Sequence, residues 1–201
     1  MRILAIETSG AFCSIAIFEN RKLIAERHER VGRGHAERLI PWISELPSGG
    51  RADEICVGCG PGSFTGVRIA IAAARGLGLG WGIPVRGVSS LALTVAGSAV
   101  QPAELTVAVE AGHGELFVQR YATNPVRQLD SLRSLTPEQA ALATDEHVIG
   151  NAAERLVTLR GWGRWSEAEG RASNMLELAS DIFLTELGPI YGRGADAKPM
   201  L

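Results

Sequence analysis

Lysine is almost absent from this chain, which carries it only at Lys22 and Lys198. The glycine-rich loop GPGSFTGVR, Gly60–Arg68, therefore lacks the lysine that a phosphate-binding P-loop requires in G-x-x-x-x-G-K-[ST]. The loop also departs from the dinucleotide fingerprint G-x-G-x-x-G, because Gly66 stands one place late and no acidic residue follows in 81–90. Taken alone, the spacing favours a structural turn over a nucleotide site.

The residues of zinc, redox and hydrolase sites are missing or badly spaced. Cys56 and Cys59 form a C-x-x-C pair, but the second pair of a zinc site is absent. Cys56 also falls in a strand pattern, where residues three apart point to opposite faces. The motif G-x-S-x-G does not occur. We expect small core cysteines, no catalytic residue and no metal site, since no two histidines stand three or four apart among His28, His35, His113 and His147.

Strong net charge and long apolar runs are also lacking. The formal net charge is −2, so no global field draws the chain to nucleic acid. The first apolar run stops at Glu7, which is too early for a signal peptide. The uncharged span 87–103 contains serines, a glutamine and a proline, which favours a helix and loop over a membrane span. An odd cysteine count then indicates a reducing compartment, and we expect a cytoplasmic protein without a membrane partner.

The glycine loop itself follows the apolar run Ile55–Gly58 and precedes a nearly uncharged segment. This order predicts a strand, a tight loop and a helix, with either Ser63 or Thr65 as the helix cap. The N–H groups at such a helix start suit an anion or the carbonyl groups of another chain. The candidate loop residues are Gly60, Gly62, Ser63, Thr65 and Gly66.

The first half of the chain predicts three antiparallel strands, a helix, a strand and a second helix. The strands are expected at 2–8, 12–18 and 22–31, and the first helix at 35–46. The second helix, 65–80, is apolar nearly all round, with Arg68 and Arg75 as its polar strip. Such a helix is normally covered on both sides. It is either an internal helix of a layered fold or a surface for a partner.

The second half is less regular. Strands are predicted at 105–110, 115–121 and 147–150, and a short helix opens with a capping box between Thr136 and Gln139. Asn151 is expected to cap a helix that reaches Leu159, and a last helix is expected over 174–187. The boundary between lobes falls near 95–101, which divides the chain into an N-terminal lobe, 1–97, and a shortened C-terminal lobe, 98–201.

Several segments together resemble one family. GPGSFTGVR, the opening MRILAIETS, the segment HAERLIP at 35–41 and IPVRGVSSL at 83–91 are similar to the TsaB (YeaZ) family, in order over the first ninety residues. This resemblance implies an α/β fold of the actin/Hsp70/sugar-kinase (ribonuclease H-like) class, with mixed sheets and helices in two lobes. It also implies a non-catalytic relative of TsaD, the protein that installs threonylcarbamoyl on adenosine 37 of tRNAs reading ANN codons.

The function implied by the resemblance is that of a scaffold or activating subunit without intrinsic catalysis. It would dock on a TsaD-like subunit, work with a TsaE-like ATPase and meet tRNA only through the complex. A homodimer through the same surface is also compatible with it. The two helices of the first half would form the partner interface, through His35, Leu39, Trp42, Leu46, Ile69, Ala72, Ala73 and Gly76.

An autonomous ATP-dependent phosphotransferase of the same fold is the alternative, and a peptidase has little support. Glu7, Thr8, Ser9 and Gly10 stand where proteins of this fold hold phosphate and magnesium, so they are a candidate vestigial nucleotide site. The loop at 110–115 departs from the family pattern D-A-R-x-x-E, with Glu110 for Asp and Gly for Arg. We therefore expect no tightly bound cofactor, with Mg–ATP as the exception to test.

Overall fold

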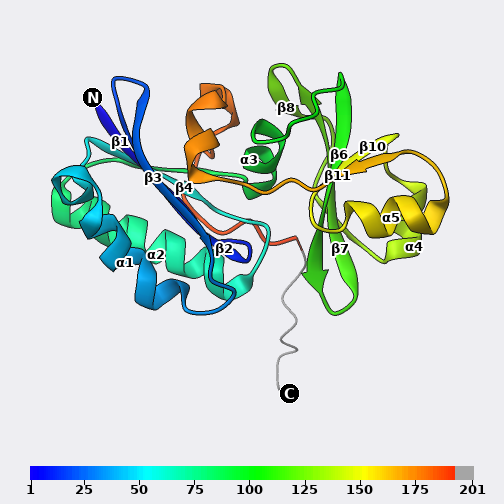
Figure 1. Ribbon diagram of the computed structural model, residues 1–201, viewed down its shortest axis with the longest axis horizontal. Helices are drawn as coiled ribbons and strands as arrows, with labels where there is room; N and C mark the ends of the chain where they lie inside the picture. Colours follow the sequence, from blue (N-terminus) through cyan, green and yellow to red (C-terminus); the bar gives the residue numbers. More distant parts are fainter. Residues whose placement is uncertain (193–201) are drawn as a thin grey trace.

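The computed structural model describes residues 1–192 and contains two β-sheets, one in each lobe (Figure 1). The first is five-stranded, with the order β3-β2-β1-β4-β5. Its first three strands are antiparallel neighbours, and the last two run parallel to β1. The strands are β1 (Arg2–Glu7), β2 (Phe12–Glu19), β3 (Lys22–Arg30), β4 (Glu54–Gly58) and β5 (Val85–Val88).

The second sheet repeats this topology. Its order is β11-β10-β6-β7-β8, with the short β9 paired to β7. In chain order, β6, β7, β8, β10 and β11 take the positions and directions that β1 to β5 take in the first sheet. The strands are β6 (Glu104–Gly112), β7 (Glu115–Thr123), β8 (Val126–Gln128), β9 (Arg133–Leu135), β10 (His147–Ile149) and β11 (Arg164–Ser166).

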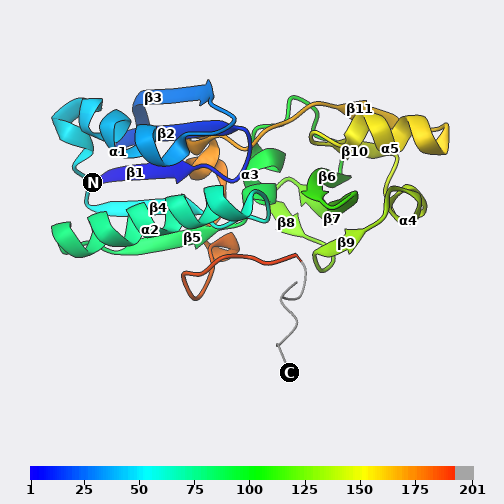
Figure 2. The ribbon, with the colours of Figure 1, turned by 90° about the horizontal axis from the view of Figure 1, so that it is seen from below.

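Helices cover the outer face of each sheet and fill the space between them (Figures 1 and 2). The helices α1 (His35–Glu45) and α2 (Phe64–Trp81) lie on the first sheet, and α4 (Pro137–Leu142) and α5 (Ala153–Arg160) lie on the second. Between the sheets lie α3 (Ser90–Ala96) and the 3₁₀ helix η2 (Ala172–Glu177). The 3₁₀ helices η1 (Pro47–Gly50) and η3 (Ser180–Ile182) complete the set in residues 1–192.

Alternation along the strands separates the layers, because successive strand residues point to opposite faces. In β1, Leu4 and Ile6 pack with α1 and α2, whereas Ile3 and Ala5 pack with α3. The inner cluster continues from α3 onto the second sheet, so one apolar core joins both lobes. We call it the central core; it includes Ile3, Ala5, Leu91, Leu93, Leu105, Val107, Ile149 and Met175.

The expected fold of two lobes with mixed sheets is confirmed. The second lobe is the smaller one, since α4 and α5 have 6 and 8 residues against 11 and 18 in α1 and α2. The capping box is confirmed too: the Thr136 hydroxyl accepts from Gln139 N, and the Gln139 side chain accepts from Thr136 N. Within residues 1–192, no helix combines the length and apolar character needed to cross a bilayer.

Two predictions for the second half are wrong. Asn151 does not cap α5; its Oδ1 accepts a hydrogen bond from Glu110 N at 2.9 Å, and Ala152 is the N-cap residue. The last helix, expected over 174–187, is replaced by η2, η3 and extended chain. The backbone there turns to other parts of the molecule for its hydrogen bonds, which a single helix would have satisfied internally.

The final described segment, 183–192, returns to the first lobe and is called the C-terminal strap below. Leu184 N donates to Gly87 O and Ile190 N to Cys59 O, both at 2.8 Å, and Phe183 forms a β-bridge with Val88. Residues 183–192, which fall within the range expected for the second lobe, thus contact the first sheet, whereas η2 lies between the two sheets. The strap crosses beneath the first sheet, close to the outer edge of β5 (Figure 2).

Candidate functional site

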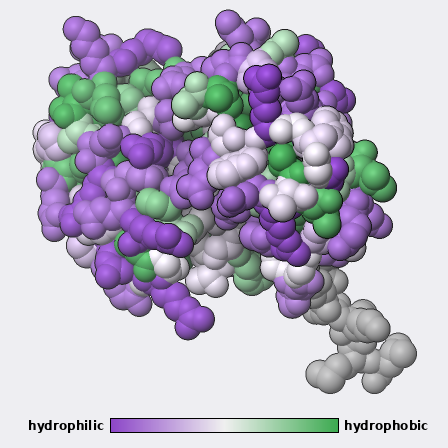
Figure 3. All heavy atoms as spheres, turned by 45° about the vertical axis from the view of Figure 1, so that its right-hand side comes forward, coloured by the Kyte–Doolittle hydropathy of each residue, from purple (hydrophilic) through white to green (hydrophobic). Residues whose placement is uncertain are grey.

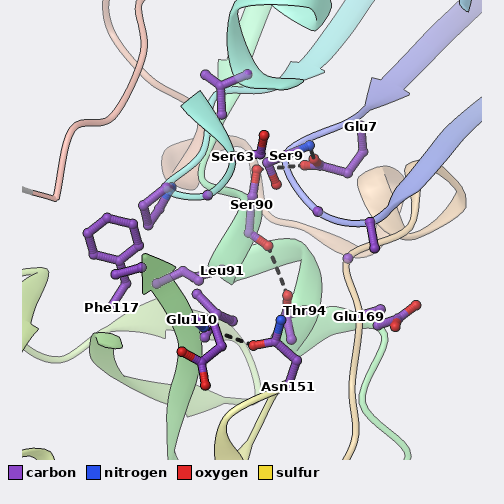
Figure 4. A pocket seen from close by; sticks show the side chains of 18 of the residues that line it. Glu7, Ser9, Ser63, Ser90, Leu91, Thr94, Glu110, Phe117, Asn151 and Glu169 are labelled. Atoms are coloured by element: carbon purple, nitrogen blue, oxygen red, sulfur yellow. Dashed lines mark hydrogen bonds between the residues drawn. The ribbon is translucent and has the colours of Figure 1, made fainter. Parts of the chain in front are cut away.

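A cavity of about 1290 Å³ opens between the lobes. The turn after β1, the glycine loop, the start of α3, the β6–β7 hairpin and the end of the strap line it. Because the two sheets share one topology, the equivalent strand ends of both lobes meet at this cavity. Figure 4 shows Glu7, Ser9, Ser63 and Ser90 on one side, with Phe117, Glu110 and Asn151 across from them.

Glu7 is the buried carboxyl group of this site, with 3% of its surface exposed. Ser9 N donates to its Oε1 at 2.5 Å, and the Ser90 hydroxyl donates to its Oε2 at 2.6 Å. Gly58 lies so close that a Cβ there would collide with Oε2. Burial raises the pKa of Glu7 above its ordinary value of 4.5, and the hydrogen bonds from Ser90 and Ser9 offset part of this rise.

The glycine loop is tied to the turn after β1. Ser63 N donates to Ser9 O at 2.7 Å, and the Thr8 hydroxyl donates to Gly66 O at 2.7 Å. A Cβ on Gly66 would collide with the Thr8 carbonyl oxygen, so this glycine is required by close backbone approach. Ser63 caps α2 by accepting from Gly66 N at 3.3 Å.

The remaining loop residues fit the same picture. A Cβ on Gly62 would collide with Ser9 O, and one on Gly60 would lie 2.9 Å from a Val67 methyl group. Thr65 is exposed and does not cap the helix. The structure therefore brings together the two groups that the sequence singled out, the glycine loop and residues 7–10. Their contacts account for the glycines without a phosphate.

Mg–ATP fits this corner of the cavity poorly. The Ser9 N–H and the Ser90 hydroxyl, two donors that a phosphate would use, already bind the Glu7 carboxylate. A phosphate placed there would meet that carboxylate at close range and repel it when it is ionised. Residues 1–192 also contain no cluster of three His, Cys, Asp or Glu side chains that could hold a metal ion.

The cysteines of the C-x-x-C pair lie within the protein core, as expected. Cys56 and Cys59 are both buried and reduced, and burial raises the pKa of Cys56 to about 12 and that of Cys59 to about 11. Cys13 is also a buried free thiol. A thiol with so high a pKa is a poor nucleophile and a poor metal ligand, because both roles need the thiolate.

Four residues that we expected at a partner interface are buried in the chain's own core. On α1, Leu39 and Trp42 are 1% and 6% exposed and pack against the first sheet. His35 is equally enclosed, with its Nε2 3.2 Å from Phe12 O, and Leu46 follows the helix as part of the same cluster. A docking protein has no access to these side chains. An apolar stripe on a helical wheel identifies a covered face but not what covers it.

The expected residues of α2 divide differently. Ala72 and Gly76 are exposed, whereas Ile69 and Ala73 are half-buried at the margin. Val67, Ala70, Ile71, Ala74 and Gly78 face the sheet. The sequence reasoning missed Leu79, which is 88% exposed on the same side as Ala72. Placing position 79 on the same helical wheel as position 72 would have found it, because seven residues make nearly two full turns.

Other exposed apolar residues are spread over both lobes. In the first lobe they include Leu23 and Ile24 on β3 and Ile40 on α1, and in the second lobe Leu142, Leu159, Trp162 and Trp165. Figure 3, which brings the second lobe forward, shows hydrophobic patches separated by hydrophilic residues. On the second lobe, the exposed Trp162 side chain is covered in part by the Arg160 guanidinium, which lies 3.9 Å from its ring centre. The outer face of α2 is therefore the stronger candidate for a partner surface.

The two-lobed fold, built from two copies of one mixed-sheet topology around a cleft, is that of the actin/Hsp70/sugar-kinase (ribonuclease H-like) class. The family model described as "TsaD: tRNA N6-adenosine threonylcarbamoyltransferase" matches residues 23–154. The tRNA threonylcarbamoyladenosine biosynthesis protein TsaB of Escherichia coli K12 is 32% identical over 197 residues, covering 92% of this chain and 81% of that protein. The Haemophilus influenzae TsaB is 29% identical, covering 96% and 94%. This chain belongs to the TsaB (YeaZ) family.

Solved structures agree with this assignment. YeaZ from Pseudomonas aeruginosa superimposes with a TM-score of 0.76 at 28% identity, covering 88% of this chain and 89% of that one. A Pseudomonas aeruginosa protein described as uncharacterized, with similarity to peptidase YEAZ, gives a TM-score of 0.82 at 27% identity, covering 96% and 99%. The likeness extends over both lobes, including the second half, where the sequence motifs are weak.

Proposed function

We propose that this protein is a non-catalytic scaffold and activating subunit that docks on a TsaD-related subunit. The complex would add threonylcarbamoyl to N6 of adenosine 37 in tRNAs reading ANN codons, in the cytoplasm. Family membership supports the pathway, because the relatives are named tRNA threonylcarbamoyladenosine biosynthesis proteins. A TsaE-like ATPase and the tRNA would join through the complex, and a second copy of this chain would compete for the same surface.

Two glycines of α2 are the observation that carries the docking proposal. A Cβ on Gly66 or Gly78 would collide with the chain's own atoms, but one on Gly76 or Gly80 would meet nothing within 4 Å. Glycine inside a helix costs about 0.8–1.0 kcal/mol relative to alanine. Packing within this chain gives no reason for a glycine at position 76, because Gly76 faces outward beside Ala72. Small residues in this position let another helix approach closely.

The groups that line the cavity support a non-catalytic subunit whose partners carry out the reaction. Among the described residues that line the cavity, Glu7 carries the one buried carboxyl group, and Ser9 and Ser90 already donate hydrogen bonds to it. We therefore include no resident cofactor in the proposal. Calorimetry of the isolated chain with Mg–ATP separates the two functions: micromolar binding with turnover would favour the autonomous phosphotransferase.

Replacing Gly76 by alanine is expected to change stability and docking in opposite directions. The isolated protein should become more stable by about 0.5–1 kcal/mol, because alanine is the better helix former and its methyl group meets open space. Binding to the TsaD-related subunit should weaken about tenfold, because the methyl group separates the two helices. Urea unfolding and calorimetric titration with the purified partner measure the two effects.

The matched control is Gly78→Ala on the buried side of the same helix. Its methyl group would collide with a Val85 methyl group, so this variant should lose stability. Gly76→Ala binding the partner as tightly as the wild type would contradict the proposal. So would failure of the wild-type chain to co-purify with that subunit.

A further inference from the structure

The outer face of α2 carries an unusual charge. Among the eighteen residues of this helix, Arg68 and Arg75 are the only charged ones, and both are exposed. They stand seven residues apart, nearly two helical turns, so they lie on one stripe about 10 Å from each other along the axis. Ala72 lies between them, and Leu79 continues the stripe. The stripe is thus small and apolar in its middle and positive on either side of Ala72.

No carboxylate within residues 1–192 neutralises either arginine. Arg68 lies 3.6 Å over the Phe64 ring and donates to the Tyr191 hydroxyl at 3.3 Å. Arg75 donates to Leu187 O at 2.6 Å. These partners are neutral, so both positive charges remain available to another molecule.

The C-terminal strap holds both guanidiniums in place. Tyr191 and the Leu187 carbonyl group belong to the strap, and Pro189 between them forms one wall of a groove. The groove has a volume of about 240 Å³, and its other walls are Arg68, Ile71, Ala72 and Arg75. Two charges fixed beside a preformed groove lose little side-chain freedom when a partner binds, which favours affinity and register.

A second copy of this chain would complement the stripe poorly. Face-to-face pairing of two α2 helices would bring four arginines together, and like charges across an interface are costly. The neighbouring α1 offers few free carboxylates, because Glu45 is paired with Arg27 at 2.7 Å. Glu37 in the first turn of α1 and Glu186 on the strap are the exposed acids near α2 that a second copy would have to use.

We propose that the α2 stripe is a specificity element for an acidic helix of the TsaD-related subunit. This inference rests on the proposed function and adds the chemistry of the partner. That helix carries two carboxylates about two turns apart, which pair with Arg68 and Arg75. Between them it carries small or aliphatic side chains that seat on Ala72 and Gly76. The charges select this partner over self-association, and the small residues allow the close approach.

The test reverses both charges in the full chain. Arg68→Glu/Arg75→Glu should bind the purified TsaD-related subunit about 100-fold more weakly than the wild type, as expected for oppositely charged pairs at a closed interface. Arg68→Gln/Arg75→Gln should fall between them. Wild-type binding should weaken from about 50 mM to about 500 mM salt, and binding of the glutamine variant should change less. Replacing the facing carboxylates of the partner by lysine should restore binding of the reversed variant.

Arg127→Glu is the control, because Arg127 is exposed on β8 in the other lobe and should leave binding unchanged. Equal binding by wild type and reversed variant would overturn the inference while leaving the docking proposal intact. An equal loss of partner binding in Arg127→Glu would overturn the inference as well, because the change in affinity would then depend on the net charge of the chain rather than on the α2 stripe. If sedimentation shows that reversal weakens self-association as much as partner binding, the occupant is a second copy. No binding by the wild type would overturn both proposals.

Discussion

Gly58→Ala should be among the most damaging single-methyl changes in the protein. The new Cβ would collide with Glu7 Oε2 and lie 3.1 Å from the Ser90 hydroxyl. Neither neighbour can withdraw easily, because each binds the other at 2.6 Å inside the fold. We expect a loss of about 3 kcal/mol, in the range for overpacked cores. For a chain of this size, that lowers the melting temperature by about 6–12 °C, measurable by circular dichroism.

Gly10→Ala provides the matched control at the same cavity. Its Cβ would meet nothing within 4 Å, so this variant should melt within about 2 °C of the wild type. Shortening the carboxylate side chain should relieve the collision, and Gly58→Ala/Glu7→Ala should therefore be more stable than the sum of the two single changes predicts. Strict additivity would show that the methyl group disturbs something other than Glu7.

Glu7→Gln should stabilise the isolated protein at pH 7, by on the order of 1–2 kcal/mol. Glutamine has the same shape, keeps an acceptor for Ser9 N and carries no charge to bury. The sign follows from the raised pKa of Glu7: the folded state holds the proton more tightly than the unfolded state. The stability contributed by the protonated group is therefore fully present below about pH 4.5 and is lost as pH rises through the folded-state pKa.

Urea unfolding at several values between pH 4 and pH 8 measures this effect. The difference in unfolding free energy between Glu7→Gln and wild type should grow as pH rises, because only the wild type pays for ionisation in the core. Glu26→Gln, which removes an exposed carboxylate from β3, should give a small difference at neutral pH. A Glu7→Gln curve parallel to the wild-type curve would contradict burial as the cause of the raised pKa.

Local patterns were sufficient to predict most elements of the first lobe. The central strands are apolar on both faces and bounded by turn residues, and α2 follows its serine cap. The capping box at Thr136 predicted a short helix correctly for the same reason: donor, acceptor and spacing are all local. The prediction of a last helix was wrong because Phe183, Leu184 and Ile190 make long-range contacts with the first lobe instead. No pattern within 174–187 reveals that surface.

The candidate site shows the same division. The sequence identified both Glu7 and the glycine loop, but the hydrogen bond from Ser90, 83 positions away, depends on the fold. Composition likewise cannot tell Gly66, which a backbone contact requires, from Gly76, which faces open space. The burial of the expected interface residues of α1 depends on the fold in the same way, because a helix shows which of its faces is apolar, not whether its own sheet covers that face.

The central core has a mechanical consequence. Enzymes that close around a substrate usually hinge between domains, and a hinge needs a seam with little apolar contact across it. Here, α3 and η2 are buried between both sheets, so rotating the lobes apart would expose apolar side chains to water. We therefore expect the cleft to keep a fixed width, without hinge closure of the two lobes. The outer helix α2 is then held on a rigid two-lobed body.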